Sequence, residues 1–204
     1  MSESPLTKTE QAHLRRRGIR LEYATIGWNV AEAAITIGLG VAAGSIALVA
    51  FGLDSIIEVF ASGVVVWHER HPNVPLEKTR RALRLIGAAF FLLGIFLVIA
   101  AIARLIAGTT PDESPFGISY LALTVVVMFS LARLKHATGE ALQSRPLLAE
   151  AHVTYLDSAL AAGVLAALVV FALWGWWWAD PLAAIVVAVF AFAEGREAWR
   201  GDVV

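Results

Sequence analysis

Four acidic residues lie inside long apolar stretches of this sequence and are its best candidates for chemistry: Glu32, Asp54, Glu58 and Asp157. Asp54 and Glu58 are four residues apart, so a helix places both on one face, about 6 Å apart along its axis. Two negative charges at that separation repel each other where water is excluded. Unless a cation lies between them, at least one carboxyl group holds a proton at neutral pH. The pair therefore predicts binding of protons or of a cation.

Each of these acids also has a structural interpretation. A lone acid inside an apolar stretch can be protonated and hydrogen-bonded between two helices. For Glu32, the neighbouring Asn29 and Thr36 share its helical face and could form such an interhelical cluster. Glu150 lies on the same face as Asp157, about 10 Å closer to the cytoplasm in the expected topology. It is either a ligand on the approach to the site or an interfacial acid, and we leave both open.

The elements that carry these acids are predicted from composition. Hydrophobic residues make up 58% of the chain and charged residues 16%, against about 25% charged residues in soluble proteins. The apolar stretches are about twenty residues long, which is enough to cross roughly 30 Å of hydrocarbon. We expect an all-α integral membrane fold, a six-transmembrane-helix bundle. The expected helices cover residues 21–42, 46–67, 85–107, 117–134, 147–173 and 179–198, and the fourth is the shortest.

The expected domain organisation follows from these spans. Residues 1–20 form a basic N-terminal segment in the cytoplasm, and residues 21–200 form the transmembrane domain. A signal peptide is not expected, because the first apolar run is too long for one. No soluble C-terminal domain is expected after the sixth helix.

The positive charges predict the orientation. Of sixteen Lys and Arg residues, fifteen fall on one side of the expected spans, including Arg133, Lys135 and Arg145 between the fourth and fifth helices. The exception is Arg104. By the positive-inside rule both termini are cytoplasmic, and the opposite loops carry only acids (Asp112, Glu113 and Asp180). We expect a multi-pass protein of the cell inner or plasma membrane, in contact with lipid.

The four acids reach a similar depth in this arrangement. Glu32, Asp54 and Glu58 lie roughly 13–20 Å from the outer surface, at 1.5 Å per residue, and Asp157 falls in the same middle zone. No lysine or arginine is expected in that layer, so protons or a bound cation must supply the counter-charge. A charge at the bilayer centre costs at least about 2.5–3.5 kcal/mol on insertion scales, which makes these acids functional candidates.

Other functional classes are excluded by simple observations. The net charge is −1 and there is no cysteine, so we expect no nucleic-acid partner, no disulfide and no thiolate ligand. No nucleophile–base constellation, phosphate-binding loop or cofactor motif is visible, and we do not expect an enzyme.

Three segments resemble the cation diffusion facilitator family. Residues 43–58 are similar to that family's turn into its second helix, where Gly-Ser and several apolar residues precede two acids four residues apart. Residues 144–157 are similar to its approach to a fifth-helix site, and residues 179–183 resemble the start of its sixth helix. The order and spacing of the three segments extend the resemblance over nearly the whole chain.

The resemblance implies export of divalent cations from the cytoplasm in exchange for protons, by alternating access within a homodimer. It implies that Asp54, Glu58 and Asp157 are metal ligands. The sequence departs from the family pattern at position 153, where valine stands in place of the usual His or Asp, and Thr154 or Glu150 could fill that gap. It also has Glu58 where Asp is usual, and no counterpart of the family's cytoplasmic metal-binding domain.

The metal and a possible second site follow from ligand chemistry. A site made only of oxygen ligands suits Mn²⁺, Mg²⁺ or Ca²⁺, whereas zinc prefers imidazole but also accepts carboxylates. We expect a transported divalent cation, with zinc or manganese first. His68 and His71, after the second helix, could form a secondary cytoplasmic metal site, although an ordinary polar loop is the favoured interpretation.

An alternative function from another class remains. The chain could be a membrane assembly or interaction protein that transports nothing, in which the buried acids only lock helices together.

Overall fold

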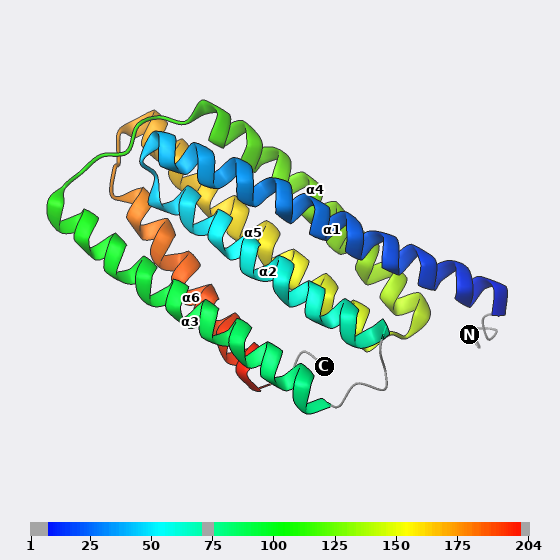
Figure 1. Ribbon diagram of the computed structural model, residues 1–204. Coiled ribbons are helices and arrows are strands. Elements are labelled where there is room, and N and C mark those ends of the chain that lie inside the picture. The colour runs from blue at the N-terminus through cyan, green and yellow to red at the C-terminus, as the bar shows by residue number, and fades with distance from the viewer. Residues whose placement is uncertain (1–7, 71–75, 201–204) are drawn as a thin grey trace.

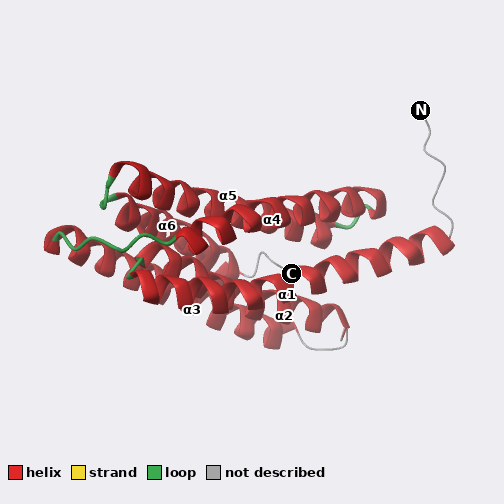
Figure 2. Ribbon diagram, turned by 90° about the horizontal axis from the view of Figure 1, so that it is seen from above, coloured by secondary structure: helices red, strands yellow, loops and turns green. Residues whose placement is uncertain are grey.

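The computed structural model describes residues 8–70 and 76–200, which form a bundle of six helices (Figure 1). No strand occurs in these two ranges (Figure 2). The all-α fold predicted from the sequence is confirmed. The helices are α1 (Lys8–Ala43), α2 (Ile46–Arg70), α3 (Leu76–Ala107), α4 (Pro115–Leu142), α5 (Arg145–Trp174) and α6 (Ala179–Arg200).

All six helices are longer than predicted, and α1, α3 and α4 differ most from the prediction. The helix α1 begins at Lys8 instead of residue 21, so the described part of the basic N-terminal segment is already helical. Likewise, α3 begins at Leu76 instead of residue 85. The prediction that the fourth helix is the shortest is wrong, because α4 has 28 residues and α6 has 22. Hydropathy finds only the part of a helix that lies in hydrocarbon, and polar residues can continue the same helix beyond it.

Five helices, α1 to α5, are long and apolar enough to cross a membrane. The sixth carries Asp180, Glu194, Arg196 and Glu197 within its 22 residues, which lowers its apolar content. Large apolar side chains such as Leu85, Leu92 and Ile106 are 69–83% exposed along α3. Soluble proteins rarely leave so much apolar surface uncovered, and lipid provides the cover here. The chain is a multi-pass integral membrane protein.

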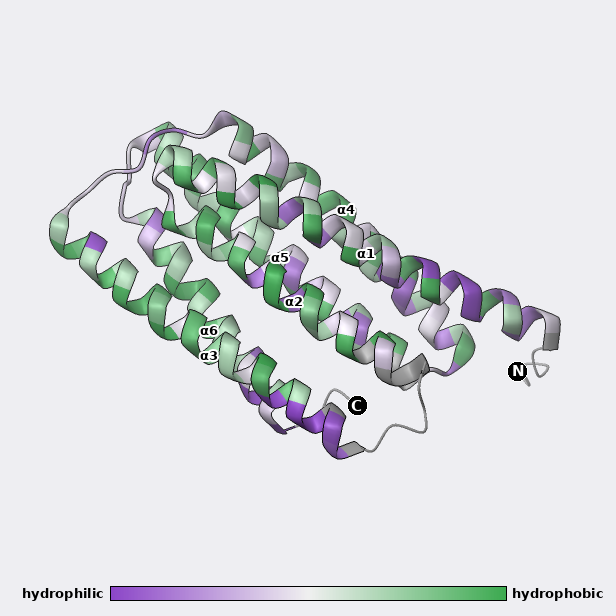
Figure 3. Ribbon diagram, viewed as in Figure 1, coloured by the Kyte–Doolittle hydropathy of each residue, from purple (hydrophilic) through white to green (hydrophobic). Residues whose placement is uncertain are grey.

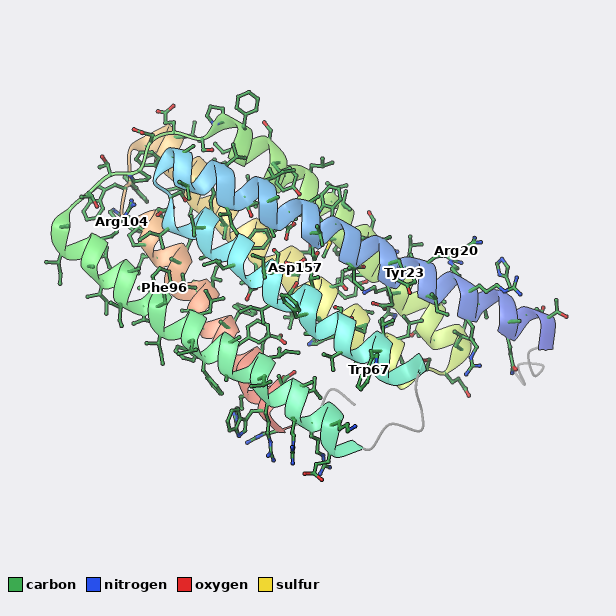
Figure 4. All side chains as sticks on the ribbon, viewed as in Figure 1. Arg20, Tyr23, Trp67, Phe96, Arg104 and Asp157 are labelled. Atoms are coloured by element: carbon green, nitrogen blue, oxygen red, sulfur yellow. The ribbon has the colours of Figure 1, made fainter. Side chains whose placement is uncertain are left out.

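The connections divide the bundle into two ends (Figure 1). We call the end at which α1 starts and α4 ends the terminal end, and the opposite end the far end. Hydrophilic residues gather on the N-terminal part of α1 and at the start of α3, both at the terminal end (Figure 3). Arg20 lies at the terminal end and Arg104 at the far end (Figure 4). This separation of charge matches the predicted pattern of loops.

The helix α2 occupies the centre of the bundle, where it contacts α1, α3, α5 and α6. Glycine allows the closest of these approaches. A Cβ atom added to Gly52 of α2 would lie 2.4 Å from the Thr36 hydroxyl of α1, so any larger residue would push the helices apart. Similarly, a Cβ atom on Gly87 of α3 would lie 2.8 Å from the carbonyl oxygen of Gly195 in α6. Backbone approach at small residues is the usual packing mode of helices in lipid.

Asp180 ties the start of α6 to the start of α2. It was expected to be a loop acid, but it is fully buried. Its carboxylate accepts hydrogen bonds from the Ser45 hydroxyl and from the backbone N–H of Ile46 at 2.9 Å. The Ser45 hydroxyl also accepts a hydrogen bond from the Leu48 N–H at 3.1 Å, as an N-cap does. This junction holds α2, and with it Asp54 two turns further on.

Candidate metal centre

The acids predicted from the sequence lie inside the bundle. Glu32 of α1 is fully buried, Asp54 of α2 and Asp157 of α5 are each 2% exposed, and Glu58 of α2 is 9% exposed. Asp157 lies near the middle of the bundle (Figure 4). The carboxyl group of Glu58 lies within electrostatic range of Asp157, Asp54, Glu194 and Glu32. The acids of α1, α2 and α5 therefore share one interior region.

The oxygen atoms that are buried without a hydrogen-bond partner include Asn29 Oδ1, Asp54 Oδ1 and Asp157 Oδ2. Native proteins satisfy the large majority of buried side-chain oxygens, so an exception needs a physical reason. Carboxylate and amide oxygens are ligands that hard divalent cations accept. Binding of a cation or of protons would satisfy these atoms and cancel the repulsion between the acids.

The acidic side chains are too far apart to form a metal site as they stand. Within residues 8–70 and 76–200, no three His, Asp or Glu side chains come close enough together to hold a metal ion. Like charges without a counter-ion keep their distance, so a bound ion would have to draw Asp54, Glu58 and Asp157 together. The contact between α2 and α5 is less extensive than those of α2 with α1, α3 and α6.

Glu32 has more hydrogen-bond partners than Glu58, because two side chains donate to its carboxylate. It accepts hydrogen bonds from the Ser55 hydroxyl of α2 at 2.7 Å and from the Trp28 indole N–H at 3.1 Å. The Thr36 hydroxyl donates to the backbone carbonyl of Glu32 and not to the Glu32 carboxylate. These bonds agree with the interhelical interpretation of Glu32, although Ser55 and Trp28 take the place expected for Asn29 and Thr36.

Asn29 is bonded to a different acid. Its side-chain N–H group donates to Glu58 Oε2 at 3.0 Å, across the contact between α1 and α2. The bond orients the Glu58 carboxylate, as outer hydrogen bonds to metal ligands commonly do. Sequence reasoning placed Asn29 beside Glu32, because residues three apart share a helical face. It could not find the contact with Glu58, which depends on how the two helices are rotated.

Thr154 and Glu150 do not join the central acids. The Thr154 hydroxyl donates to the Glu150 carbonyl at 2.8 Å and accepts a hydrogen bond from Lys135 Nζ at 3.2 Å. Glu150 Oε2 lies 3.7 Å from the same ammonium group, and Glu22 Oε2 of α1 lies 3.0 Å from it. The structure thus groups both residues around a lysine instead of around Asp54 and Glu58.

Two expectations about Lys135 were wrong. It was placed in the connection between the fourth and fifth helices, but it lies inside α4 and its side chain is fully buried. It was also expected that no basic residue shares the acid layer, whereas the positive charge of Lys135 acts on Asp157. A signal for this was present in the sequence. Residues 118–138 contain neither proline nor glycine, and Lys135 continues a stripe of buried residues spaced three or four apart: Gly117, Leu121, Thr124, Met128, Ala132, Lys135 and Thr138.

Two further residues were missed by sequence reasoning. Glu22 was assigned no role because it lies at the polar edge of the first expected helix. Glu194 of α6 was assigned none either, yet its charge acts on both Asp54 and Glu58. Of the proposed secondary site, His71 lies outside the described residues. His68 belongs to the last turn of α2, and its side chain is also outside the described part.

Taken together, these features define a helical membrane protein with acids buried at its centre and unpartnered oxygens among them. Residues 82–201, which are more than half of the chain, match the cation efflux transmembrane domain. The chain belongs to this family, as its resemblance to cation diffusion facilitators predicted. The match includes Asp157 and Lys135.

Curated relatives match a larger part of the chain. It is 25% identical over 189 residues to the uncharacterized transporter sll1263 of Synechocystis sp., a match that covers 87% of this chain and 61% of that protein. It is 28% identical over 172 residues to the magnetosome protein MamB of Magnetospirillum gryphiswaldense, covering 78% and 56%. It is 26% identical over 189 residues to metal tolerance protein 4 of Oryza sativa, covering 86% and 45%. The chain thus spans between 45% and 61% of the length of these relatives.

Proposed function

We propose that this chain exports a divalent metal cation across its membrane in exchange for protons, by alternating access. The observation that carries the proposal is the pair of unpartnered, buried carboxylate oxygens, Asp54 Oδ1 on α2 and Asp157 Oδ2 on α5. Membership of a family of transporters, rather than of enzymes, supports it.

In this mechanism Asp54 and Glu58 hold the cation from α2, and Asp157 holds it from α5. The three acids repel one another inside the bundle, so they are not stable as bare carboxylates. Either protons or a divalent cation must neutralise them. Metal that enters from the cytoplasm displaces protons, and protons that arrive from the outer side displace the metal. Exchange follows because neither of the two occupants can leave without replacement by the other.

The substrate and the assembly are part of the same proposal. Zinc or manganese is the proposed metal, because the candidate ligands are all oxygen atoms and both ions accept carboxylates. We also propose a homodimer in the cell inner or plasma membrane, with the terminal end of the bundle in the cytoplasm. The basic residues gathered at that end support this orientation.

The proposal is tested by metal flux in proteoliposomes that contain the purified protein and an internal pH dye. We expect uptake of Zn²⁺ or Mn²⁺ with opposing proton movement. The change Asp54→Asn keeps the shape of the side chain and removes its charge, and it should abolish both signals. The matched control is Asp112→Asn, which changes an exposed acid and should transport like the wild type.

Other outcomes discriminate against the proposal. Normal flux in both Asp54→Asn and Asp157→Asn would remove these residues from the site. A folded wild-type protein that moves neither metal would favour the alternative, a membrane assembly or interaction protein whose acids hold helices together. In that case Asp54→Asn should impair assembly.

A further inference from the structure

The group around Lys135 is a second place in the bundle where oxygen atoms from different helices surround a positive charge. Glu22 comes from α1, Lys135 from α4, and Glu150 and Thr154 from α5. The ammonium group has Glu22 Oε2 at 3.0 Å, Thr154 Oγ1 at 3.2 Å and Glu150 Oε2 at 3.7 Å. Its side chain is fully buried, while those of Glu22 and Glu150 are 14% and 15% exposed.

The charges in this group are unbalanced. When both carboxyl groups are ionised, they leave one negative charge beside the ammonium group, and Glu22 Oε1 is buried without any hydrogen-bond partner. A divalent cation held by the same two carboxylates would bring the net charge to zero. The Lys135 ammonium is thus a poorer electrostatic match for this pair of acids than a divalent ion.

The position of the group connects it to the central acids. Thr154 precedes Asp157 by three residues on α5, which is about 4.5 Å along the helix axis, and Glu150 lies about 10 Å before Asp157. Asp157 is 2% exposed, and its Oδ2 atom has no partner. A cation that moved along α5 from the terminal end would meet Glu150 and Glu22 before it reached Asp157.

We infer that Glu22, Glu150 and Thr154 form a second site for a divalent cation, which the Lys135 ammonium group occupies in this structure and from which the incoming metal displaces it. The two occupants exclude each other. Metal–oxygen bonds are about 2.0–2.6 Å long, so the oxygens must close in on a metal ion more tightly than on the ammonium group. A second positive charge cannot remain at that distance. Lys135 therefore acts as a competitor that partly neutralises the site until metal arrives.

This inference rests on the proposed function only for the choice of a divalent metal as ligand. It is tested by the number of Mn²⁺ or Zn²⁺ ions bound per chain in purified, detergent-solubilised protein, measured by equilibrium dialysis. At a metal concentration too low to displace Lys135, we expect one tightly bound ion in the wild type. Lys135→Met keeps the length of the side chain without its charge and should bind two. The matched control is Lys78→Met, at an exposed lysine, and it should bind one.

Combined variants locate the second ion. Adding Glu22→Gln to Lys135→Met should return the count to one. Adding Asp54→Asn to Lys135→Met should remove the central ion and also leave one. If the central site were wrong and the second site right, the wild type would bind none and Lys135→Met would bind one, so the two failures are distinguishable. Equal counts in Lys135→Met and the wild type would overturn the inference.

Transport gives an independent readout. A site that is open for only part of the time binds with an apparent affinity reduced in proportion to that fraction. If Lys135 occupies the site about 90% of the time, removal of Lys135 should lower the KM for metal by about tenfold. A structural role for Lys135 would lower the rate and leave KM unchanged. Lys135→Arg keeps the positive charge and should retain the higher KM.

A labelling experiment on the wild type covers the case in which Lys135→Met does not fold. The chain has three lysines, Lys8, Lys78 and Lys135, so acetylation at each can be followed by mass spectrometry. Lys135 should be protected in the presence of a chelator and become several-fold more reactive with saturating Mn²⁺, while Lys78 should not change. Unchanged protection of Lys135 with metal bound would contradict displacement.

Discussion

Two groups of buried acids follow one another along α5, and they are neutralised in different ways. Glu150, with Glu22 opposite, has a lysine ammonium group of the protein beside it. Asp157, with Asp54 and Glu58 nearby, has orphaned oxygens and no comparable partner among the described residues. The difference is instructive because both groups face the same problem, which is negative charge away from water. The first group has a counter-charge from the protein itself, the Lys135 ammonium group, and the second depends on a cation or on protons from outside.

The largest expected effect is that of removing the Lys135 counter-charge. Without metal, Lys135→Met leaves Glu22 and Glu150 buried beside each other, and loss of one partner of a buried ion pair costs about 3–5 kcal/mol. We expect a corresponding drop in the unfolding temperature of the purified protein in chelator. Lys78→Met should show no drop, because that lysine is exposed. If Lys135→Met were as stable as the wild type, the ammonium group would not be what neutralises the first group.

The next effect concerns a residue that orients a candidate ligand. Asn29 donates to Glu58, and loss of a hydrogen bond that orients a metal ligand typically weakens metal binding about 10–100-fold. Asn29→Ala should therefore weaken binding of Mn²⁺ or Zn²⁺ by that factor in equilibrium dialysis. Asn29→Asp should give a different metal affinity from Asn29→Ala, because aspartate keeps a side-chain oxygen but adds a negative charge and lacks the N–H donor. Unchanged affinity in Asn29→Ala would show that Glu58 does not bind the ion.

The smallest effect is the sharpest test of the comparison. Removal of one acid should change the free energy of unfolding in opposite directions in the two groups. Asp157→Asn removes one of several repelling charges and should stabilise the metal-free protein. Glu22→Gln weakens the ion pair with Lys135 and should destabilise it. We expect about 1 kcal/mol in each direction, measured by thermal unfolding in chelator. Destabilisation by both changes would mean that the central acids are structural.

Much of the arrangement could be predicted from local sequence patterns. Apolar stretches of about twenty residues indicate helices that cross a membrane. The described residues form six helices, of which five are long and apolar enough to do so. The spacing of Asp54 and Glu58 implies a shared helical face, and both are buried together in α2. The extent of α4 was predicted less well, because hydropathy falls at the polar residues 133–140 although the backbone continues as a helix to Leu142.

The sequence by itself determined the fold class, the family and which acids lie inside membrane-crossing helices. Each of these depends on residue type and on spacing within one helix. Only the tertiary structure decided which partner each acid has. Glu22 and Lys135 are 113 residues apart, and Ser45 and Asp180 are 135 apart. Such pairs form when separate helices pack at particular rotations, and helix rotation follows from the packing of the whole bundle. For this reason Lys135 is a polar loop residue by local pattern and a buried counter-ion in the folded protein.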